Sequence, residues 1–149
     1  MRALIQRVKE ARVDSDTEEL GQIATGLVVF LGVASSDLLK DIDYIVRKVV
    51  NIRIFEDESG RFNRSALEIN AELLVVSQFT LCAETQKGRR PSFINAAPPE
   101  IAENIYKNFC KNLQDENIPV IMGRFGAMME VGLKNDGPVT ILLDSRDRK

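Results

Sequence analysis

Alternating hydrophobic and polar positions run through the first quarter of the chain and predict β-strands. Residues 2–13 alternate imperfectly, so they predict a strand without fixing which side chains share a face. A polar turn at 14–16 separates this strand from a short one at 18–23, and a longer apolar strand follows at 27–33. We expect these three strands to form an antiparallel meander.

Helical spacing replaces alternation in two segments. Residues 35–37 are Ser, Ser and Asp, whose side chains cap helix N-termini, and apolar residues then recur every three or four positions. The apolar stripe of this predicted helix is Leu38, Leu39, Ile42, Ile45, Val46, Val49 and Val50. A second helix begins at 98–100, where proline is tolerated in the first turn. Its predicted core face is Ile101, Ile105, Phe109 and Leu113.

Further strands are predicted at 53–56, at 73–79, where both faces are apolar, and near the C-terminus at 128–135 and 138–144. Asn, Asp, Gly and Pro at 135–138 predict a turn between the last two. The order βββ-α-ββ-α-ββ with short turns predicts an α+β fold: an antiparallel, barrel-like curved sheet with two helices packed outside. We expect one domain over residues 1–149 and fraying of the charged end at 144–149.

The composition is that of an ordinary globular domain, with 44% hydrophobic and 28% charged residues. No apolar run approaches the ~20 residues that a membrane-spanning helix needs, so we expect no membrane partner. Cys82 and Cys110 are too few for a disulfide framework and favour a reducing cytoplasm. Cys110 falls beside the apolar face of the second helix and is interpreted as a small packed hydrophobe.

The chain has no histidine, which excludes Ser-His-Asp and Cys-His catalysis and histidine-bearing zinc sites. Two cysteines also exclude a Cys₄ metal site within one chain, and neither a metal nor a cofactor is predicted. The formal charge of −2 argues against a protein that coats nucleic acid through many phosphates. It permits a grip on one end of an RNA, and the irregular segment 84–97 carries three basic residues: Lys87, Arg89 and Arg90.

Two motifs stand where chemistry is expected. Ser77-Gln78-Phe79-Thr80-Leu81 follows the apolar run 73–76, so polar groups lie at the mouth of a buried strand. Asn135-Asp136-Gly137-Pro138-Val139-Thr140 lies between two alternating apolar runs. Taken alone, the second motif predicts a β-turn followed by a strand that starts with proline, and its Gly-Pro bond is one that can be cis.

Together the two motifs resemble the signature motifs of the D-aminoacyl-tRNA deacylases. The resemblance continues in family order through residues 6–8, 47–48, 51–57, 87–93 and 123–129. It implies the same α+β class, a homodimer with the active site at the subunit interface, and the acceptor end of aminoacyl-tRNA as the partner. The implied reaction is hydrolysis of D-aminoacyl-tRNA, and of glycyl-tRNA mischarged on another tRNA, to free amino acid and tRNA.

The resemblance also implies roles for single residues. In the family, the Gly137-Pro138 bond is cis and enters the partner subunit's active site, where its carbonyls occupy the space that an L-side chain would need. Arg7 matches the position whose guanidinium holds this motif, and Phe125 and Met129 match positions near the terminal adenine. Without the family, Arg7 is an ordinary surface or interface arginine, and Phe125 and Met129 are core side chains.

The residues themselves leave two mechanisms open. The candidate nucleophiles are Ser77, Thr80 and Cys82. Each needs a base, and without histidine only Lys87 or Glu84 is available nearby, with no spacing that fixes either one. In the stronger hypothesis the terminal ribose hydroxyl of the substrate assists hydrolysis, and the protein supplies preorganised donors worth about 10²–10³ in rate each. Those donors are the backbone amides of Phe79 and Thr80, the Ser77 hydroxyl and the Gln78 amide.

Two rival functions come from other classes. A non-enzymatic nucleic-acid-binding module would use the basic residues at 87–90, but the acidic balance and the absence of Trp argue against it. A generic esterase is weakened by the missing base. The departures from the family are small: Arg61-Phe62-Asn63 replaces a more frequent Lys-Met-Asn, away from any proposed catalytic role, and Cys82 replaces a frequent Tyr.

Overall fold

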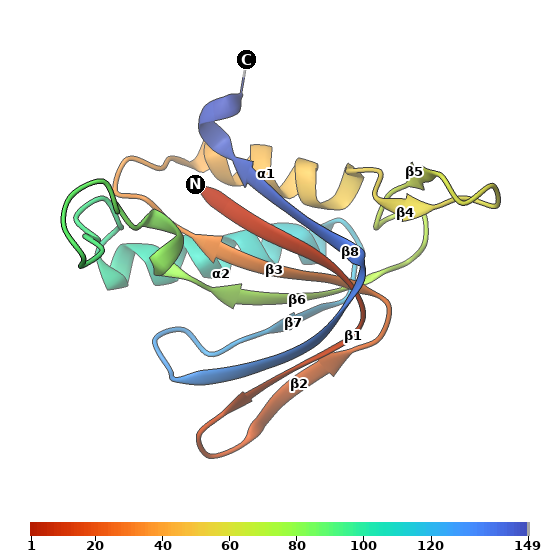
Figure 1. The fold of residues 1–149 in the computed structure, drawn as a ribbon, viewed down its shortest axis with the longest axis horizontal. Helices are drawn as coiled ribbons and strands as arrows, with labels where there is room; N and C mark the ends of the chain where they lie inside the picture. The colour runs from red at the N-terminus through yellow and green to blue at the C-terminus, as the bar shows by residue number, and fades with distance from the viewer. Residues whose placement is uncertain (149) are drawn as a thin grey trace.

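The long strand β1 (Arg2–Ser15) organises the sheet in the computed structural model, which describes residues 1–148 (Figure 1). Its first half pairs with β3 and its second half with β2, while β8 pairs along its whole length, so the strand order is β2-β1-β3-β6-β7 with β8 on β1. The bounds are β2 (Glu19–Ile23), β3 (Gly26–Gly32), β6 (Glu72–Ser77), β7 (Val120–Met122) and β8 (Met129–Asp144).

The sheet is mixed, which corrects the predicted antiparallel sheet. Its barrel-like curvature and its two helices are as predicted, but β6 pairs in parallel with both β3 and β7. Parallel neighbours need long crossovers, and the two helices, α1 (Leu39–Asn51) and α2 (Pro99–Asp115), lie within these crossovers. The predicted meander is also wrong, because β1 lies between β2 and β3.

The C-terminal strands predicted at 128–135 and 138–144 are one strand, β8, and no hairpin joins them. Both parts pair with β1, but between the partners of Gln6 and Val8 the chain runs from Thr140 back to Asn135. Two steps along β1 therefore face five along β8, and three extra residues bulge out of the sheet. The Gly137-Pro138 peptide bond, which is cis, lies in this bulge.

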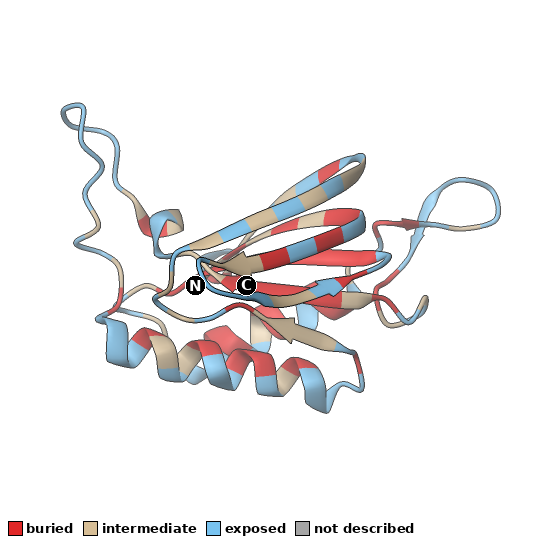
Figure 2. Ribbon diagram, turned by 90° about the horizontal axis from the view of Figure 1, so that it is seen from below, coloured by how far each residue is buried: buried red, intermediate tan, exposed pale blue. Residues whose placement is uncertain are grey.

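Both helices pack on one face of the sheet, and their buried positions face the strands (Figure 2). The buried stripe of α1 begins at Ile42, because Leu38 and Leu39 are exposed. The core face of α2 is shifted from the predicted one, since Ile101 is exposed. The buried residues of α2 are Ala102, Tyr106, Phe109, Cys110 and Leu113, so Cys110 is packed as predicted.

A second, smaller core lies on the opposite face, between the β1–β2 hairpin and the central strands. Val8 and Val13 of β1 meet Leu74 and Val76 of β6 there. Strand β6 is thus buried on both faces, as its apolar run predicted.

Four short elements were not predicted: two strands and two 3₁₀ turns, the first of these turns at Phe79–Cys82. β4 (Phe55–Glu56), predicted as a strand at 53–56, pairs with the unpredicted β5 (Phe62–Arg64) in a hairpin that projects beyond the sheet, yellow in Figure 1. β7 was also missed. A 3₁₀ turn at Ser145–Asp147 replaces the predicted fraying: Ser145 is buried and its amide donates to Met1 O at 2.8 Å. Residue 149 lies outside the described residues, within which no helix is long and apolar enough to cross a membrane.

Candidate functional site

The first motif lies where β6 leaves the core. The chain passes from Ser77 into a 3₁₀ turn, η1 (Phe79–Cys82), and the Gln78 amide donates to Leu31 O at 2.7 Å, which ties the end of β6 to β3. Ser77 and Gln78 are half-buried, whereas Phe79 and Thr80 are exposed. The amides of Phe79 and Thr80 precede the first bond of the turn, so the turn gives them no acceptor.

The hydroxyls of this motif have no ionisable partner. The Thr80 hydroxyl accepts a hydrogen bond from Nε2 of the Gln78 side chain. Within residues 1–148, no lysine or carboxylate hydrogen-bonds to Ser77 or Thr80, so neither Lys87 nor Glu84 serves as a base in this arrangement. The geometry therefore favours donors over an activated nucleophile.

Gly32 of β3 lies directly behind η1. A Cβ added at Gly32 would come within 2.8 Å of Leu81 Cβ and 3.1 Å of Gln78 O. Any side chain at this position would therefore displace the turn. Sequence reasoning missed Gly32, because the close approach joins segments more than 40 residues apart.

Tyr106 of α2 fixes a second segment beside the end of β6. Its hydroxyl lies 2.8 Å from Val75 O and 3.1 Å from Gly123 O, and the Gly123 amide donates to Val75 O at 2.8 Å. Burial raises the pKa of Tyr106, so the hydroxyl keeps its proton and remains a donor. Phe125 packs against this ring with centroids 6.0 Å apart, and Met129 begins β8 close to Gly123.

Tyr106 was also missed from the sequence. Its place on the buried face of α2 is the one signal that could have marked it. Through it, the segment 123–129 comes to the same end of β6 as the first motif. Both side chains are half-buried: Phe125 packs against the main core and Met129 against the smaller core.

The second motif is braced by Arg7, which is 4% exposed. Its Nε donates to Asp136 O at 2.9 Å, and Nη1 donates to Ile54 O at 2.6 Å. The Glu56 carboxylate lies 3.7 Å from Nη2. The Phe62 ring lies against the guanidinium, with its centroid 5.0 Å from Cζ of Arg7. A buried guanidinium therefore holds the start of the bulge to the β4–β5 hairpin.

Asn135 closes the bulge from the other side. Its Oδ1 accepts from the Val139 amide at 2.7 Å, and its Nδ2 donates to Thr140 Oγ1 at 3.0 Å. Gly137 and Pro138 between these anchors are exposed. Gly137 has a φ of +138°, which L-residues rarely adopt, so its place in the bulge requires glycine.

The two motifs do not meet within one chain. Ser77 pairs with Leu31, which pairs with Ala3, whereas the bulge stands beside Arg7, four residues farther along β1. At ~3.3 Å per residue and ~4.8 Å per strand, this offset is roughly 13 Å along the sheet and roughly 14 Å across it. The structure thus groups Ser77–Thr80 with 123–129, and Arg7 with Gly137 and Pro138.

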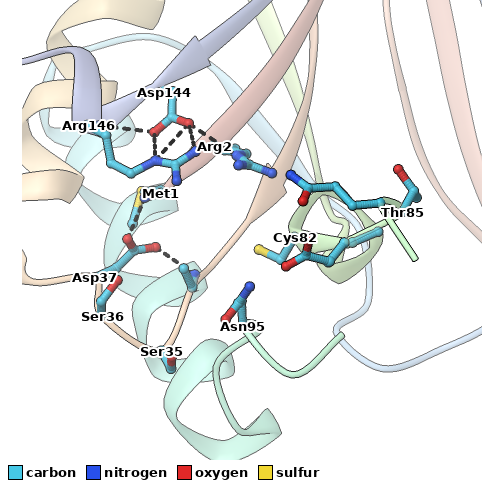
Figure 3. Close-up of a pocket in the computed structure, with 14 residues that line it drawn as sticks. Met1, Arg2, Ser35, Ser36, Asp37, Cys82, Thr85, Asn95, Asp144 and Arg146 are labelled. Carbon is cyan, nitrogen blue, oxygen red and sulfur yellow. Dashed lines mark hydrogen bonds and ion pairs between the residues drawn. The ribbon is translucent and has the colours of Figure 1, made fainter. Parts of the chain in front are cut away.

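A cavity of about 570 Å³ lies beyond η1 (Figure 3). Of the candidate nucleophiles, bases and other site residues, it is lined by Cys82 and Glu84, and by none of Ser77–Thr80, Arg7, Phe125, Met129, Gly137 or Pro138. Arg146 and Arg2 hydrogen-bond to Asp144 on one wall and hold its pKa well below the ordinary value. Burial raises the pKa of the Cys82 thiol on another wall. The arginines of this cavity are already paired with Asp144, and its thiol is not activated. Among residues 1–148, no three His, Cys, Asp or Glu side chains are arranged to hold a metal.

Comparisons with known proteins agree over nearly the whole length. The sequence model of the family described as D-Tyr-tRNA(Tyr) deacylase matches residues 4–144. A D-aminoacyl-tRNA deacylase of Thermosipho africanus is 52% identical, over 98% of both chains. Another, of Roseiflexus castenholzii, is 56% identical over 97% of this chain and 92% of its own.

Solved structures share the fold. One described as a c-Myc DNA unwinding element binding protein has a TM-score of 0.91 and 41% identity, covering 97% of this chain and 98% of its own. Another, described as a probable eukaryotic D-amino acid tRNA deacylase, has a TM-score of 0.83 and covers 95% of this chain and 97% of its own. Its 18% identity makes this second likeness one of fold alone.

Proposed function

The chain belongs to the D-aminoacyl-tRNA deacylase family, and from that premise we propose how its two motifs divide the work of hydrolysing the ester. The enzyme is a hydrolase that cleaves D-aminoacyl-tRNA to free amino acid and tRNA, a proofreading step in translation. Residues 1–149 act as one deacylase domain, in the cytoplasm where translation occurs, and hold the acceptor end of the tRNA.

The ester carbonyl binds at Ser77–Thr80. The unbonded amides of Phe79 and Thr80 face the oxygen that becomes negative when water adds to the carbonyl carbon. The neighbouring ribose hydroxyl of the substrate orients that water. The bond from the carbonyl carbon to the ribose oxygen then breaks, and the ribose oxygen takes the proton lost by the water. The observation that supports this route is the absence of an ionisable partner at Ser77 and Thr80 among the described residues.

Chiral selection is assigned to Gly137 and Pro138 of a second copy of the chain. D and L esters carry the same groups and differ only in where the side chain points, so selection has to come from blocked space. The bulge suits this role because it is exposed at its tip and braced at both ends, by Arg7 and by Asn135. Its offset from Ser77 within one chain supports a homodimer in which each bulge completes the partner's site.

Blocked space has a consequence for glycine, which has no side chain to collide. Glycyl-tRNA is therefore a substrate together with D-aminoacyl-tRNA. The terminal adenine lies against Phe125 and Met129, two half-buried side chains that follow β7, Phe125 against the main core and Met129 against the smaller one. No cofactor enters this scheme.

A second candidate function is nucleic-acid binding without catalysis. One relative, 41% identical, is described as binding a DNA element. Here the loop held by paired backbone bonds between Glu84 and Ser92 presents Lys87, Arg89 and Arg90 to solvent. The net charge of −2 limits such binding to a few phosphates.

Single-turnover release of amino acid separates these functions. D-tyrosyl-, D-alanyl- and glycyl-tRNA should be hydrolysed, and L-alanyl-tRNA should be spared. Attractive recognition of a D-side chain would instead lower the activation free energy by about 1–3 kcal/mol for each methylene-sized group, so the rate would grow with side-chain size. L-alanyl-tRNA cleaved as fast as glycyl-tRNA would remove the selecting role from Gly137 and Pro138. Binding of tRNA with no release from any ester would favour the second candidate.

The same assay tests the route. Thr80→Ala and Ser77→Ala should each keep measurable turnover, because neither hydroxyl is the nucleophile. Replacing the terminal ribose hydroxyl by hydrogen should reduce the rate far more. A folded, tRNA-binding Thr80→Ala enzyme with no turnover would contradict this route.

A further inference from the structure

Phe62 is a large apolar side chain that is 53% exposed, yet its ring has a specific neighbour. The centroid lies 5.0 Å from the Arg7 guanidinium carbon, within the range of a cation–π contact. Single exposed apolar residues are common and need no explanation. Here the neighbour is Arg7, a buried cation that donates a hydrogen bond to Asp136 O in the bulge.

The β4–β5 hairpin holds Arg7 from two directions. Glu56 and Phe62 are paired across this hairpin, and both reach Arg7: the carboxylate at 3.7 Å from Nη2, the ring at the guanidinium carbon. The loop of the hairpin is itself ordered, because the Asp57 carboxylate accepts hydrogen bonds from Ser59 and Arg61. The ordered β4–β5 hairpin therefore holds the Arg7 guanidinium in place.

Arg7 in turn lies close to the selecting backbone. Its Nε contacts Asp136 O, and its Nη2 is 3.2 Å from the position that a Cβ on Gly137 would occupy. A small displacement of the guanidinium is therefore passed to the bulge through the hydrogen bond to Asp136 O, one residue before Gly137. Because blocked space discriminates by position alone, a displacement of this size alters how completely an L-side chain is refused.

We propose that Phe62 is a positioning residue for chiral selection, acting through Arg7 on Gly137. This rests on the selecting role proposed above for the bulge. It gives Phe62 a role in a segment, 61–63, to which the sequence alone assigned none. An aliphatic side chain would fill the same space but lacks the negative ring face that attracts a guanidinium.

The test compares Phe62→Leu with Phe62→Tyr by single-turnover cleavage of L-alanyl- and D-alanyl-tRNA. A cation–π contact at an exposed site is worth about 0.5–1 kcal/mol, so Phe62→Leu should raise the L-to-D rate ratio about two- to fivefold. Phe62→Tyr keeps the ring and should restore the wild-type ratio. Glu58→Ala, at the 95% exposed tip of the same hairpin, should leave the ratio unchanged.

A double-variant comparison distinguishes positioning from a general loosening of the fold. In an Arg7→Gln background, which lacks the cation, Phe62→Leu should produce no further change in the ratio. An equal effect in both backgrounds would overturn the proposal, and so would a wild-type ratio for Phe62→Leu in an enzyme that still selects D over L. A wild-type enzyme without that selection would instead overturn the proposed function itself, and this inference with it.

Discussion

At the scale of single residues, Gly137 is the position where a methyl group matters most. Besides its positive φ, an added Cβ would lie 2.7 Å from Val139 Cγ2. Gly137→Ala should therefore shift the bulge and raise the L-to-D rate ratio on the order of tenfold or more. The measurement is single-turnover cleavage of L-alanyl- and D-alanyl-tRNA.

Gly132→Ala is the matched control for this variant. It lies on the same strand, has no positive φ, and an added Cβ would meet no atom within 4 Å. Its ratio should equal that of the wild type. If Gly137→Ala also kept the wild-type ratio, the bulge would not be the selecting element.

The sequence predicted where the first motif lies in the fold better than it predicted the residues that support the two motifs. An apolar run followed by polar residues placed Ser77–Thr80 correctly at the end of a buried strand. Gly32, Phe62 and Tyr106 were missed because each acts on a segment far from it in the chain. Local patterns carry no signal of such contacts.

At the scale of elements, α2 contributes one polar group to the site region, the Tyr106 hydroxyl. Tyr106→Phe would leave the carbonyls of Val75 and Gly123 without this donor. The expected loss in the free energy of unfolding is about 1–2 kcal/mol, measured by urea denaturation. Tyr44→Phe changes the other tyrosine, which lies half-buried on α1, and should cost less than about 0.5 kcal/mol. Equal losses for the two variants would show that the hydroxyl bonds add nothing.

The elements differ in how clearly the sequence predicts them. The first strand, the two helices and β6 were predicted because their apolar spacing is set by burial. The parallel pairing of β6 was missed, since spacing says which positions are buried but not in which direction a neighbour runs. The 3-residue strands β5 and β7 are too short to show a period.

At the scale of the whole molecule, each site is proposed to need two chains. Light scattering should give twice the 16.7 kDa chain mass. A fully active, selective monomer would contradict the shared site.

Subunit exchange tests the sharing directly. Gly137→Ala is permissive for L-esters, while Gly32→Ala displaces η1 and should be inactive. After random exchange of equal amounts, half of the intact η1 sites face an unaltered bulge, so L-alanyl-tRNA cleavage should fall to about half of its value before exchange. D-alanyl-tRNA cleavage should stay constant. An unchanged L rate would mean that each chain selects with its own bulge.

The three extra residues in β8 also decide which core the end of the chain enters. Val131 and Leu133 pack against the small core, whereas Ile141 and Leu143, at positions of the same parity, pack against the helices. Strand side chains alternate with a period of two, so only an odd insertion can turn the later positions to the other face. The length of this bulge can therefore change only by two residues at a time, because any odd change would make Ile141 and Leu143 face solvent.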